Sequence, residues 1–419
     1  MTSLINNTNS NSALINTINS SQSKFNPNIY STKAIYPASA TTYIKTQKSS
    51  GSFGANQTMV FDLMKYGIAQ QILLCYTKVG GDTTQIGAFD FLDVIDRVEL
   101  LSSSKVIDTL TNHDLVSQFS DLDVSQYNIV DRSCVSGRTA SASHQFVVPL
   151  RFGLLSDINT QLNLQFNEPM SIRIRWGANP LQVNTGTAVT IADDDCFLKM
   201  RYKAYNESDF SEILAENYNE PELNQMSVGF YDENATSQKL TAAADGDLVV
   251  MPLTGQGAKV ELKNTDCVNN FYVMVRRQGA PKNAQGVPTG GNYQPVQINR
   301  LRMTASGQEI FDLEGVELFY SKLCKNGFSV LTSSSSTDKI VNIAKIQTGL
   351  WEYAGGGTQS NTLSLRELNN PIIEVWFQDN VATAGAAGAQ DYDVIVVEDA
   401  VKVYSTTSST GRLAVALTN

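Results

Sequence analysis

The sequence predicts an all-β protein made of two tandem β domains, and three observations lead to this prediction. Short runs of alternating or β-branched residues recur from about Met59 onward, separated by segments rich in turn residues. Helical periodicity is confined to a few short stretches. A weak internal repeat relates the two halves of the chain. Many short strands with little helix are typical of sandwiches, jelly rolls and barrels.

Length and composition narrow the class further. The 419 residues are enough for two or three domains with large cores, and 42% of them are apolar, as in folded globular proteins. Charged residues make up only 17%, against about 25% in ordinary soluble proteins, which suggests that much of the surface is either neutral polar or buried against other subunits. The net charge of -10 argues against a protein that binds nucleic acid through its whole surface, and we expect no sequence-specific nucleic-acid partner.

Residues 1–55 differ from the rest of the chain and form a predicted N-terminal arm. The first 50 residues contain 8 Asn, 10 Ser and 7 Thr, and no acidic residue occurs before Asp62. The arm therefore carries +4 and the remainder -14. Such a segment cannot fold alone, so it is either a disordered tail or an arm that becomes ordered against partners. If it is an arm, its lysines should contact an anionic membrane or an acidic flank of a neighbour: Lys24, Lys33, Lys45 and Lys48.

Strand patterns divide the remaining chain into two β domains, which we expect at residues 56–205 and 224–405. Between them, residues 206–223 contain six acidic and no basic residues with apolar side chains on one helical face, which predicts a linker helix. Residues 406–419 are rich in Ser and Thr and are expected to form a C-terminal tail. The alternation predicts inward-pointing side chains in both domains: Ile172, Ile174 and Trp176 in the first, and Ile373, Val375 and Phe377 in the second.

The second domain repeats the first. The 19 residues that start at Arg97 align without a gap with the 19 that start at Arg300, and five are identical: Arg97/Arg300, Ser103/Ser306, Ile107/Ile310, Leu110/Leu313 and Leu115/Leu318. Each copy predicts a strand, a turn at SSSK or ASGQ, a short β run and a helix. The expected apolar helix faces are Leu115, Val116 and Phe119 in the first copy, and Val316, Phe319, Tyr320 and Leu323 in the second. A period of about 200 residues is too long for a solenoid and indicates two copies of one domain.

No motif in the sequence indicates catalysis or metal binding. The two histidines, His113 and His144, have no G-x-S-x-G or H-E-x-x-H motif to support them. Either could belong to a Ser-His-Asp set, because such sets are assembled in space, but nothing else favours one. The run Asp193–Asp195 is typical of a solvated turn, although calcium also prefers such oxygens. We expect no enzyme, and no catalytic, cofactor or metal-binding residue.

Cysteine usage and hydropathy indicate the compartment. Five cysteines, at positions 75, 134, 196, 267 and 324, have no metal-ligand or redox spacing, and we interpret them as buried reduced thiols. No apolar run approaches the ~18 residues of a membrane span. The N-terminal sequence MTSLINNTNS lacks the charged-then-apolar pattern of a secretory signal. These features favour synthesis and assembly in a reducing cytoplasm.

The order of these elements resembles the double jelly-roll major capsid proteins of tailless icosahedral DNA viruses, in the branch of nucleocytoplasmic large DNA viruses, virophages and polinton-like viruses. The resemblance lies in the order and duplication of several segments: 61–78, 95–119, 147–152, 162–176 and 360–377. This sequence departs from the family at the first turn, where Ser104 replaces the usual glycine, whereas Gly307 keeps it in the second copy.

The resemblance implies two tandem eight-stranded jelly rolls with short helices in loops. It also implies a structural protein of the virion, assembled in the host cytoplasm, whose homotrimers form pseudo-hexameric capsomers. Two barrels in each of three chains provide the six lobes that hexagonal packing needs. The implied partners are neighbouring capsomers, minor capsid or penton proteins, and an internal membrane contacted by the arm. The alternative is a tandem jelly-roll adhesin or glycan-binding spike protein, which the duplication and the basic arm disfavour.

Overall fold

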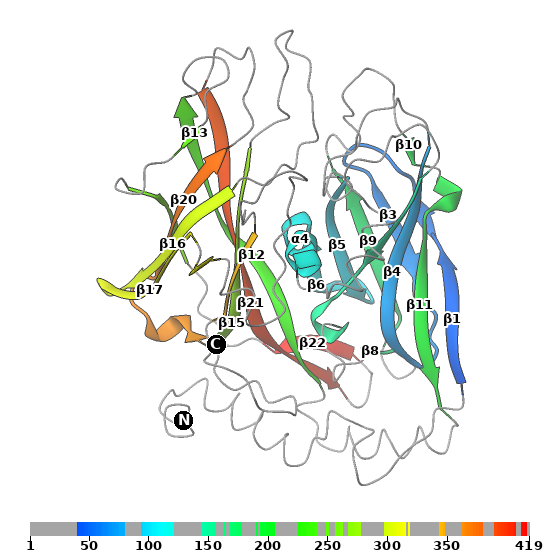
Figure 1. The fold of residues 1–419 in the computed structure, drawn as a ribbon. Helices are drawn as coiled ribbons and strands as arrows, with labels where there is room; N and C mark the ends of the chain where they lie inside the picture. Colours follow the sequence, from blue (N-terminus) through cyan, green and yellow to red (C-terminus); the bar gives the residue numbers. More distant parts are fainter. Residues whose placement is uncertain are drawn as a thin grey trace.

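The computed structural model shows an all-β chain folded into two barrels (Figure 1). It describes residues 40–79, 94–120, 144–155, 162–164, 168–177, 190–191, 193–205, 225–241, 249–250, 256–262, 267–277, 297–315, 317–318, 343–347, 363–379, 389–407 and 412–416. Each barrel is a pair of antiparallel sheets, and the four sheets follow one another across the molecule.

Barrel one consists of sheet I and sheet II. Sheet I pairs β1 (Ala40–Gln47), β11 (Phe197–Ala204), β4 (Ile68–Val79) and β7 (His144–Pro149), and the short β8 (Leu162–Asn163) and β10 (Thr190–Ile191) also pair with β4. Sheet II pairs β3 (Thr58–Asp62), β9 (Met170–Trp176), β5 (Ile95–Ser102) and β6 (Lys105–Thr111), with the short β2 (Ser50–Gly51) beside β3. Of these eleven described strands, eight have five or more residues, in agreement with the predicted eight-stranded jelly roll.

Barrel two repeats this arrangement in sheet III and sheet IV. Sheet III pairs β12 (Gln225–Thr241), β21 (Ala389–Thr407), β15 (Cys267–Arg277) and β18 (Ile343–Gln347), while β19 (Leu363–Ser364) pairs with β15 and β22 (Arg412–Ala416) with β21. Sheet IV pairs β14 (Ala258–Glu261), β20 (Ile372–Asp379), β16 (Gln297–Ala305) and β17 (Gln308–Glu314), with β13 (Val249–Val250) beside β20. Strand by strand, sheet III corresponds to sheet I and sheet IV to sheet II.

The hairpins β5–β6 and β16–β17 show how closely the two copies agree. Each has a register shift at the same aligned position, between Leu100 and Leu101 and between Met303 and Thr304. Ser103 (φ 55°) and Ser306 (φ 52°) both adopt the left-handed conformation. Ser103 donates its N–H to Pro169 O, and Ser306 donates its N–H to Asn369 O, each over 2.8 Å. The internal repeat is confirmed at the level of single hydrogen bonds.

The two turns differ at the next residue. Gly307 is also left-handed, with φ 75°, a conformation that costs glycine little. Ser104, the aligned residue of the first turn, is not one of the described non-glycine residues that have a positive φ. The first turn therefore has no need of glycine at this position, which explains why serine replaces it there.

The predicted core register is confirmed in both barrels. Burial alternates along β9, where Ile172, Ile174 and Trp176 have no exposed surface. On β20 the predicted side chains Ile373, Val375 and Phe377 are equally buried. Burying each such side chain contributes roughly 1.5–3 kcal/mol, so these strands fix which face of each sheet is the core face.

Helix α4 (Asn112–Ser120) follows β6 as predicted and lies between the two barrels (Figure 1). It begins with a reciprocal cap: Thr111 N–H donates to Asp114 Oδ2 over 2.6 Å, and Asp114 N–H donates to Thr111 Oγ1 over 3.3 Å. Leu115 is fully buried, whereas the side chains of Val116 and Phe119 lie outside the described set. The helix contacts β5 and β6 on one side and β12 and β21 on the other.

Three short 3-10 helices complete the described elements: η1 (Gly153–Leu155), η2 (Asp193–Asp195) and η3 (Leu365–Glu367). The second predicted helix is described only at residues 317–318, where Leu318 is buried. Its other predicted face residues lie outside the described residues: Val316, Phe319, Tyr320 and Leu323. The predicted linker helix at 206–223 also lies outside them.

The structure places strands inside both terminal segments. Residues 40–51, which we assigned to the arm, form β1 and β2, and β1 pairs along its whole length with β11. Residues 412–416, which we assigned to the tail, form β22 on β21. In β1 the run ATTYIKTQ alternates, and Ile44 packs against the barrel core; low complexity hid this pattern from the sequence analysis.

Candidate assembly surfaces

The residues considered for chemistry are integrated into the barrels. His113 is buried in α4, and His144 begins β7, where its side chain is not described. Burial raises the pKa of the Cys75 thiol to about 11 and that of Cys196 to about 12, so both stay protonated as packed apolar groups. Cys75 lies in β4, as expected. Among the described residues, no group of three or more His, Cys, Asp or Glu side chains is placed to hold a metal ion.

The acidic run at 193–195 anchors the first strands of the chain. Lys48 Nζ lies 3.0 Å from Asp193 Oδ2, and the N–H of Phe53 donates to Asp193 Oδ1 over 2.8 Å. Burial alone would raise the pKa of Asp193, but the Phe53 hydrogen bond and the Lys48 ammonium outweigh it and lower the pKa. Lys48, expected to contact partners, is therefore engaged inside barrel one.

Sheet III is covered on both faces. One face contributes Phe271, Val273 and Val275 to the core of barrel two. The opposite face contributes Tyr272, Met274, Ile395 and Val397 to the apolar cluster of barrel one, and all four are fully buried. This junction, in which α4 and β6 meet β12, joins the barrels through a continuous core.

Sheet I is the equivalent of sheet III in barrel one. Among the described residues, no element packs on its outer face as barrel one packs on the outer face of sheet III. Its outward side chains on β1 and β11 form what we call the basic face: Tyr43, Lys45, Phe197, Lys199, Arg201 and Lys203. Lys45 is paired directly with Lys199, and Tyr43, 61% exposed, is paired with Arg201. Like charges opposite each other destabilise a sheet, so the face is not arranged for the stability of an isolated barrel.

The cations of the basic face have aromatic rather than acidic neighbours. Lys45 Nζ lies 4.0 Å from the Phe197 ring centre, and the Arg201 guanidinium lies 6.0 Å from that of Tyr43. Within the described part of the chain, neither lysine of the Lys45–Lys199 pair nor Arg201 has a carboxylate partner. Burial and the neighbouring Arg201 lower the pKa of Lys203.

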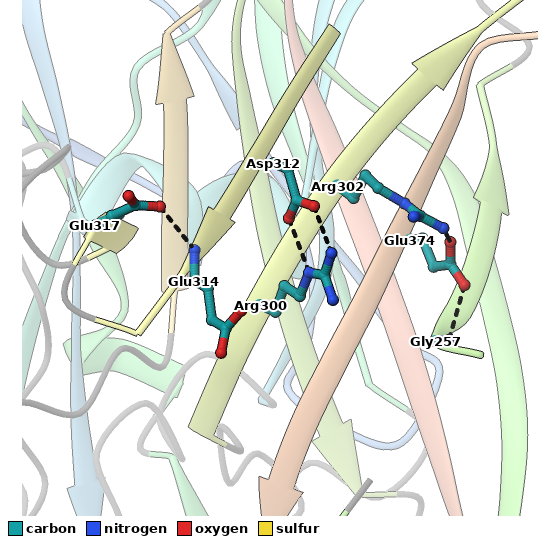
Figure 2. A network of polar contacts seen from close by, with 7 residues as sticks. All are labelled: Gly257, Arg300, Arg302, Asp312, Glu314, Glu317 and Glu374. Carbon is teal, nitrogen blue, oxygen red and sulfur yellow. Dashed lines mark hydrogen bonds and ion pairs between the residues drawn. The ribbon is translucent and has the colours of Figure 1, made fainter. Parts of the chain in front are cut away.

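Sheet IV carries a network of ion pairs on its outer face (Figure 2). Arg300 Nε donates to Asp312 Oδ1 over 2.8 Å, and its Nη2 binds the second oxygen, so the pair is bidentate. Arg302 donates to Glu374 Oε2 over 2.5 Å, and Gly257 N–H donates to Glu374 Oε1 over 2.8 Å. Both guanidinium groups lie over the Trp376 ring, at 4.7 and 5.4 Å from its centre. The network pairs these charges with one another on the outer face of sheet IV.

The edge strand β17 of sheet IV and the residues just after it carry exposed acidic side chains, which we call the acidic edge: Glu309, Glu314 and Glu317, with Ile310 next to Glu309. Within the sheet, Glu314 lies directly opposite Arg300. All three glutamates are exposed, and Ile310 is 44% exposed. Glu314 N–H donates to Glu317 Oε2 over 3.4 Å, the counterpart of the Thr111–Asp114 bond that begins α4 (Figure 2).

Sequence reasoning thus found part of this surface chemistry. Of the four lysines that it named, Lys24 and Lys33 lie outside the described residues, Lys45 lies on the basic face and Lys48 binds Asp193. It missed Lys199, Arg201 and Lys203 on β11. The signal was present, because basic residues alternate there with the buried Leu198, Met200 and Tyr202.

Known proteins resemble this chain in structure but not in sequence. No family model matches it, and no curated protein matches it. A chain of the PBCV-1 virus capsid matches with a TM-score of 0.63 at 13% identity, over 93% of this chain and 100% of the other. The mavirus major capsid protein matches with a TM-score of 0.57 at 12% identity, over 93% and 92%. The Faustovirus major capsid protein matches with a TM-score of 0.55 at 10% identity, over 88% and 91%.

These likenesses, with the paired sheets described above, define the fold as a tandem pair of jelly rolls. It is the double jelly-roll fold of viral major capsid proteins, as the sequence predicted. Among the helices that the structure describes, none has the length and apolar character of a membrane span.

Proposed function

We propose that this chain is a major capsid protein whose homotrimers are pseudo-hexameric capsomers of an icosahedral DNA-virus shell. The observation that carries the proposal is the structural likeness to the PBCV-1 capsid chain, which covers 93% of this chain and all of the other. A likeness over two complete barrels involves their relative placement as well as each barrel's fold. The function is structural, and the protein resides in the virion after assembly in the host cytoplasm.

The junction supports a role as a building block of fixed shape. Sheet III contributes side chains to both apolar clusters, so the barrels cannot move independently without exposing Tyr272, Met274, Ile395 and Val397. Exposing such residues costs roughly 1.5–3 kcal/mol each. A rigid two-lobed subunit suits a cyclic trimer with six lobes.

Electron microscopy and sedimentation of the purified protein test this function. We expect trimers with a six-lobed outline that persist at nanomolar concentration and assemble into shells. Monomers that bind glycan arrays would contradict the capsid function and favour the adhesin or spike protein. Trp176 and Trp376, which such a binding site would expose, are buried in this structure.

The N-terminal arm is proposed to contact an inner anionic membrane or an acidic flank of a neighbour, through Lys24 and Lys33. Each lysine near an anionic bilayer contributes roughly 1 kcal/mol. Because β1 begins at Ala40, a deletion that tests the arm must end before it. Removing residues 1–35 should leave folded trimers and impair shell assembly, measured by microscopy. Normal shells from the truncated chain would contradict this role, and binding of both proteins to anionic vesicles would separate membrane from neighbour contact.

A further inference from the structure

The contact between the two barrels inside the chain shows how one barrel covers the next. Strand β6 and helix α4 of barrel one lie against sheet III of barrel two. Ile107 on β6 is 4% exposed and Leu115 on α4 is fully buried, and both belong to the cluster that includes Tyr272 and Met274. This contact uses one side of a barrel and the outer face of the following barrel's first sheet.

The repeat supplies a second copy of both surfaces, and no described residue covers either of them in the same way. The equivalent of β6 and the start of α4 is the acidic edge, on and after β17. There Ile310, which is identical to Ile107 in the repeat alignment, is 44% exposed rather than 4%. The equivalent of the outer face of sheet III is the basic face of sheet I. The two uncovered surfaces lie at opposite ends of the molecule (Figure 1).

The two uncovered surfaces are complementary in charge. The basic face presents Lys45, Lys199 and Arg201, and the acidic edge presents three exposed glutamates. The basic face is unfavourable alone, because Lys45 lies directly opposite Lys199 and Arg201 Nε is buried without a hydrogen-bond acceptor. Each surface also presents an exposed apolar side chain, Tyr43 on one and Ile310 on the other. The covered copies, at the junction, instead pack apolar side chains together: Ile107 and Leu115 from barrel one, and Tyr272 and Met274 from sheet III.

We propose that the basic face binds the acidic edge of a second copy of this chain. Barrel two of one subunit then docks on barrel one of the next, as barrel one docks on barrel two inside the chain. This inference rests on the proposed function, since it assigns the surfaces by which the trimer forms. The contact is heterologous, so it closes into a ring when the rotation between neighbours divides a full turn.

The nature of the contact follows from its residues. The junction inside the chain is an apolar core, whereas the contact between chains combines three or more cations, three carboxylates and two apolar side chains. Complementary charge mainly directs encounter and register, and it weakens with ionic strength. The subunits of the trimer should therefore associate more slowly in high salt, while the barrels within each subunit stay together.

Charge reversal tests the pairing of these surfaces. The variant Lys45→Glu/Lys199→Glu/Arg201→Glu should lose trimers, with association weakened on the order of a hundredfold, because like charges now face each other. The reversal Glu309→Lys/Glu314→Lys/Glu317→Lys should do the same. The control Lys65→Glu/Lys105→Glu makes two of the three charge changes of the first variant at exposed positions outside both surfaces, and it should form normal trimers.

A variant that carries both reversals together tests the pairing of the two surfaces even if a single reversal fails to fold. Its two surfaces are complementary again, so it should recover trimers by analytical ultracentrifugation but form none that mix with the unmodified chain. Trimers that persist in both single reversals, or a doubly reversed chain that stays monomeric, would overturn the pairing. An unmodified chain that is monomeric would instead overturn the proposed function.

Discussion

Sheets I and III have the same strand order and the same place in their barrels, but different surroundings. Sheet III is buried on both faces and its strands β15 and β21 are rich in Val, Ile and Met. Sheet I is buried on one face only. Along its strands β1 and β11, outward Lys, Arg and Tyr side chains alternate with side chains that point into the core. The two sheets therefore share their topology but differ in the side chains of their outer faces. The outer face that packs on another barrel is apolar, and the one that does not is basic.

Sheets II and IV teach a second lesson, because the same cross-strand ion pair occurs in both with its charges exchanged. In barrel one Glu99 on β5 binds Arg173 on β9, over 2.5 Å. At the aligned positions in barrel two, Arg302 on β16 binds Glu374 on β20. The carboxylate is the more buried partner in both, at 8% and 7% side-chain exposure. The pair was therefore retained as a unit, not as two separate residues.

The largest difference between the barrels should appear at the junction. Truncating the fully buried Met274→Ala should lower the free energy of unfolding by about 2–5 kcal/mol, since it opens a cavity between two cores. On the equivalent strand β4, Leu73→Ala removes a half-buried outward side chain and should cost less than about 1.5 kcal/mol. Urea unfolding of both variants measures the difference. Equal losses would mean that the junction is not a continuous core.

The exchanged ion pair can be reversed in barrel one. Glu99→Arg alone places a cation among Arg97 and Arg173 and should destabilise the protein by roughly 1–3 kcal/mol. The double variant Glu99→Arg/Arg173→Glu copies the polarity of barrel two and should recover most of this loss. Adding Thr109→Asp, the aligned position of Asp312, should give Arg97 a partner worth about 0.2–1 kcal/mol. A double variant no more stable than Glu99→Arg would show that the pair is not interchangeable.

Two glycines before equivalent strands should respond differently to a methyl group. A Cβ on Gly257 would lie 2.7 Å from Glu374 Cγ and 2.9 Å from the Val375 carbonyl oxygen, so Gly257→Ala should cost about 1–3 kcal/mol. A Cβ on Gly54 would meet only the flexible Gln57 side chain at 3.0 Å, and Gly54→Ala should be nearly neutral. Thermal melting of the two variants gives the comparison, and a neutral Gly257→Ala would argue against the close approach of this segment to β20.

The smallest expected effect is a pH dependence at the Arg300–Asp312 pair, for which barrel one has no aligned carboxylate. Hydrogen bonds from Arg300 hold the pKa of Asp312 below its usual value, against the effect of burial. A depressed carboxyl pKa stabilises the fold above the unfolded pKa of about 4, and this stability is lost as the pH falls through the folded pKa. The free energies of unfolding of the unmodified protein and Asp312→Asn should differ at pH 6 and converge in strong acid. In barrel one the aligned residue is Thr109, and Thr109→Val should show no such convergence.

Sequence alone determined what depends on local periodicity. The alternation of Ile172, Ile174 and Trp176 and of their counterparts on β20 predicted the core faces, because a strand exposes opposite faces at successive residues. The gapless alignment that starts at Arg97 and Arg300 predicted the duplication, and in the structure its aligned serines, Ser103 and Ser306, are both left-handed. The strand β1 was missed, since its alternating pattern is made largely of threonines and lies within a Ser- and Asn-rich region.

Only the tertiary structure decided what depends on contacts between distant segments. Both faces of β15 and β21 carry apolar residues, so the local pattern predicts that both are buried but not against what. Only the packed structure shows that Tyr272 and Met274 face barrel one. Phe271 and Val273, on the opposite face, point into the core of barrel two. Lys45 and Lys199 are 154 residues apart, and only the pairing of β1 with β11 places them side by side. A strand's sequence specifies two faces, but the free energy of burying one face against a particular neighbour exists only once the barrels have packed.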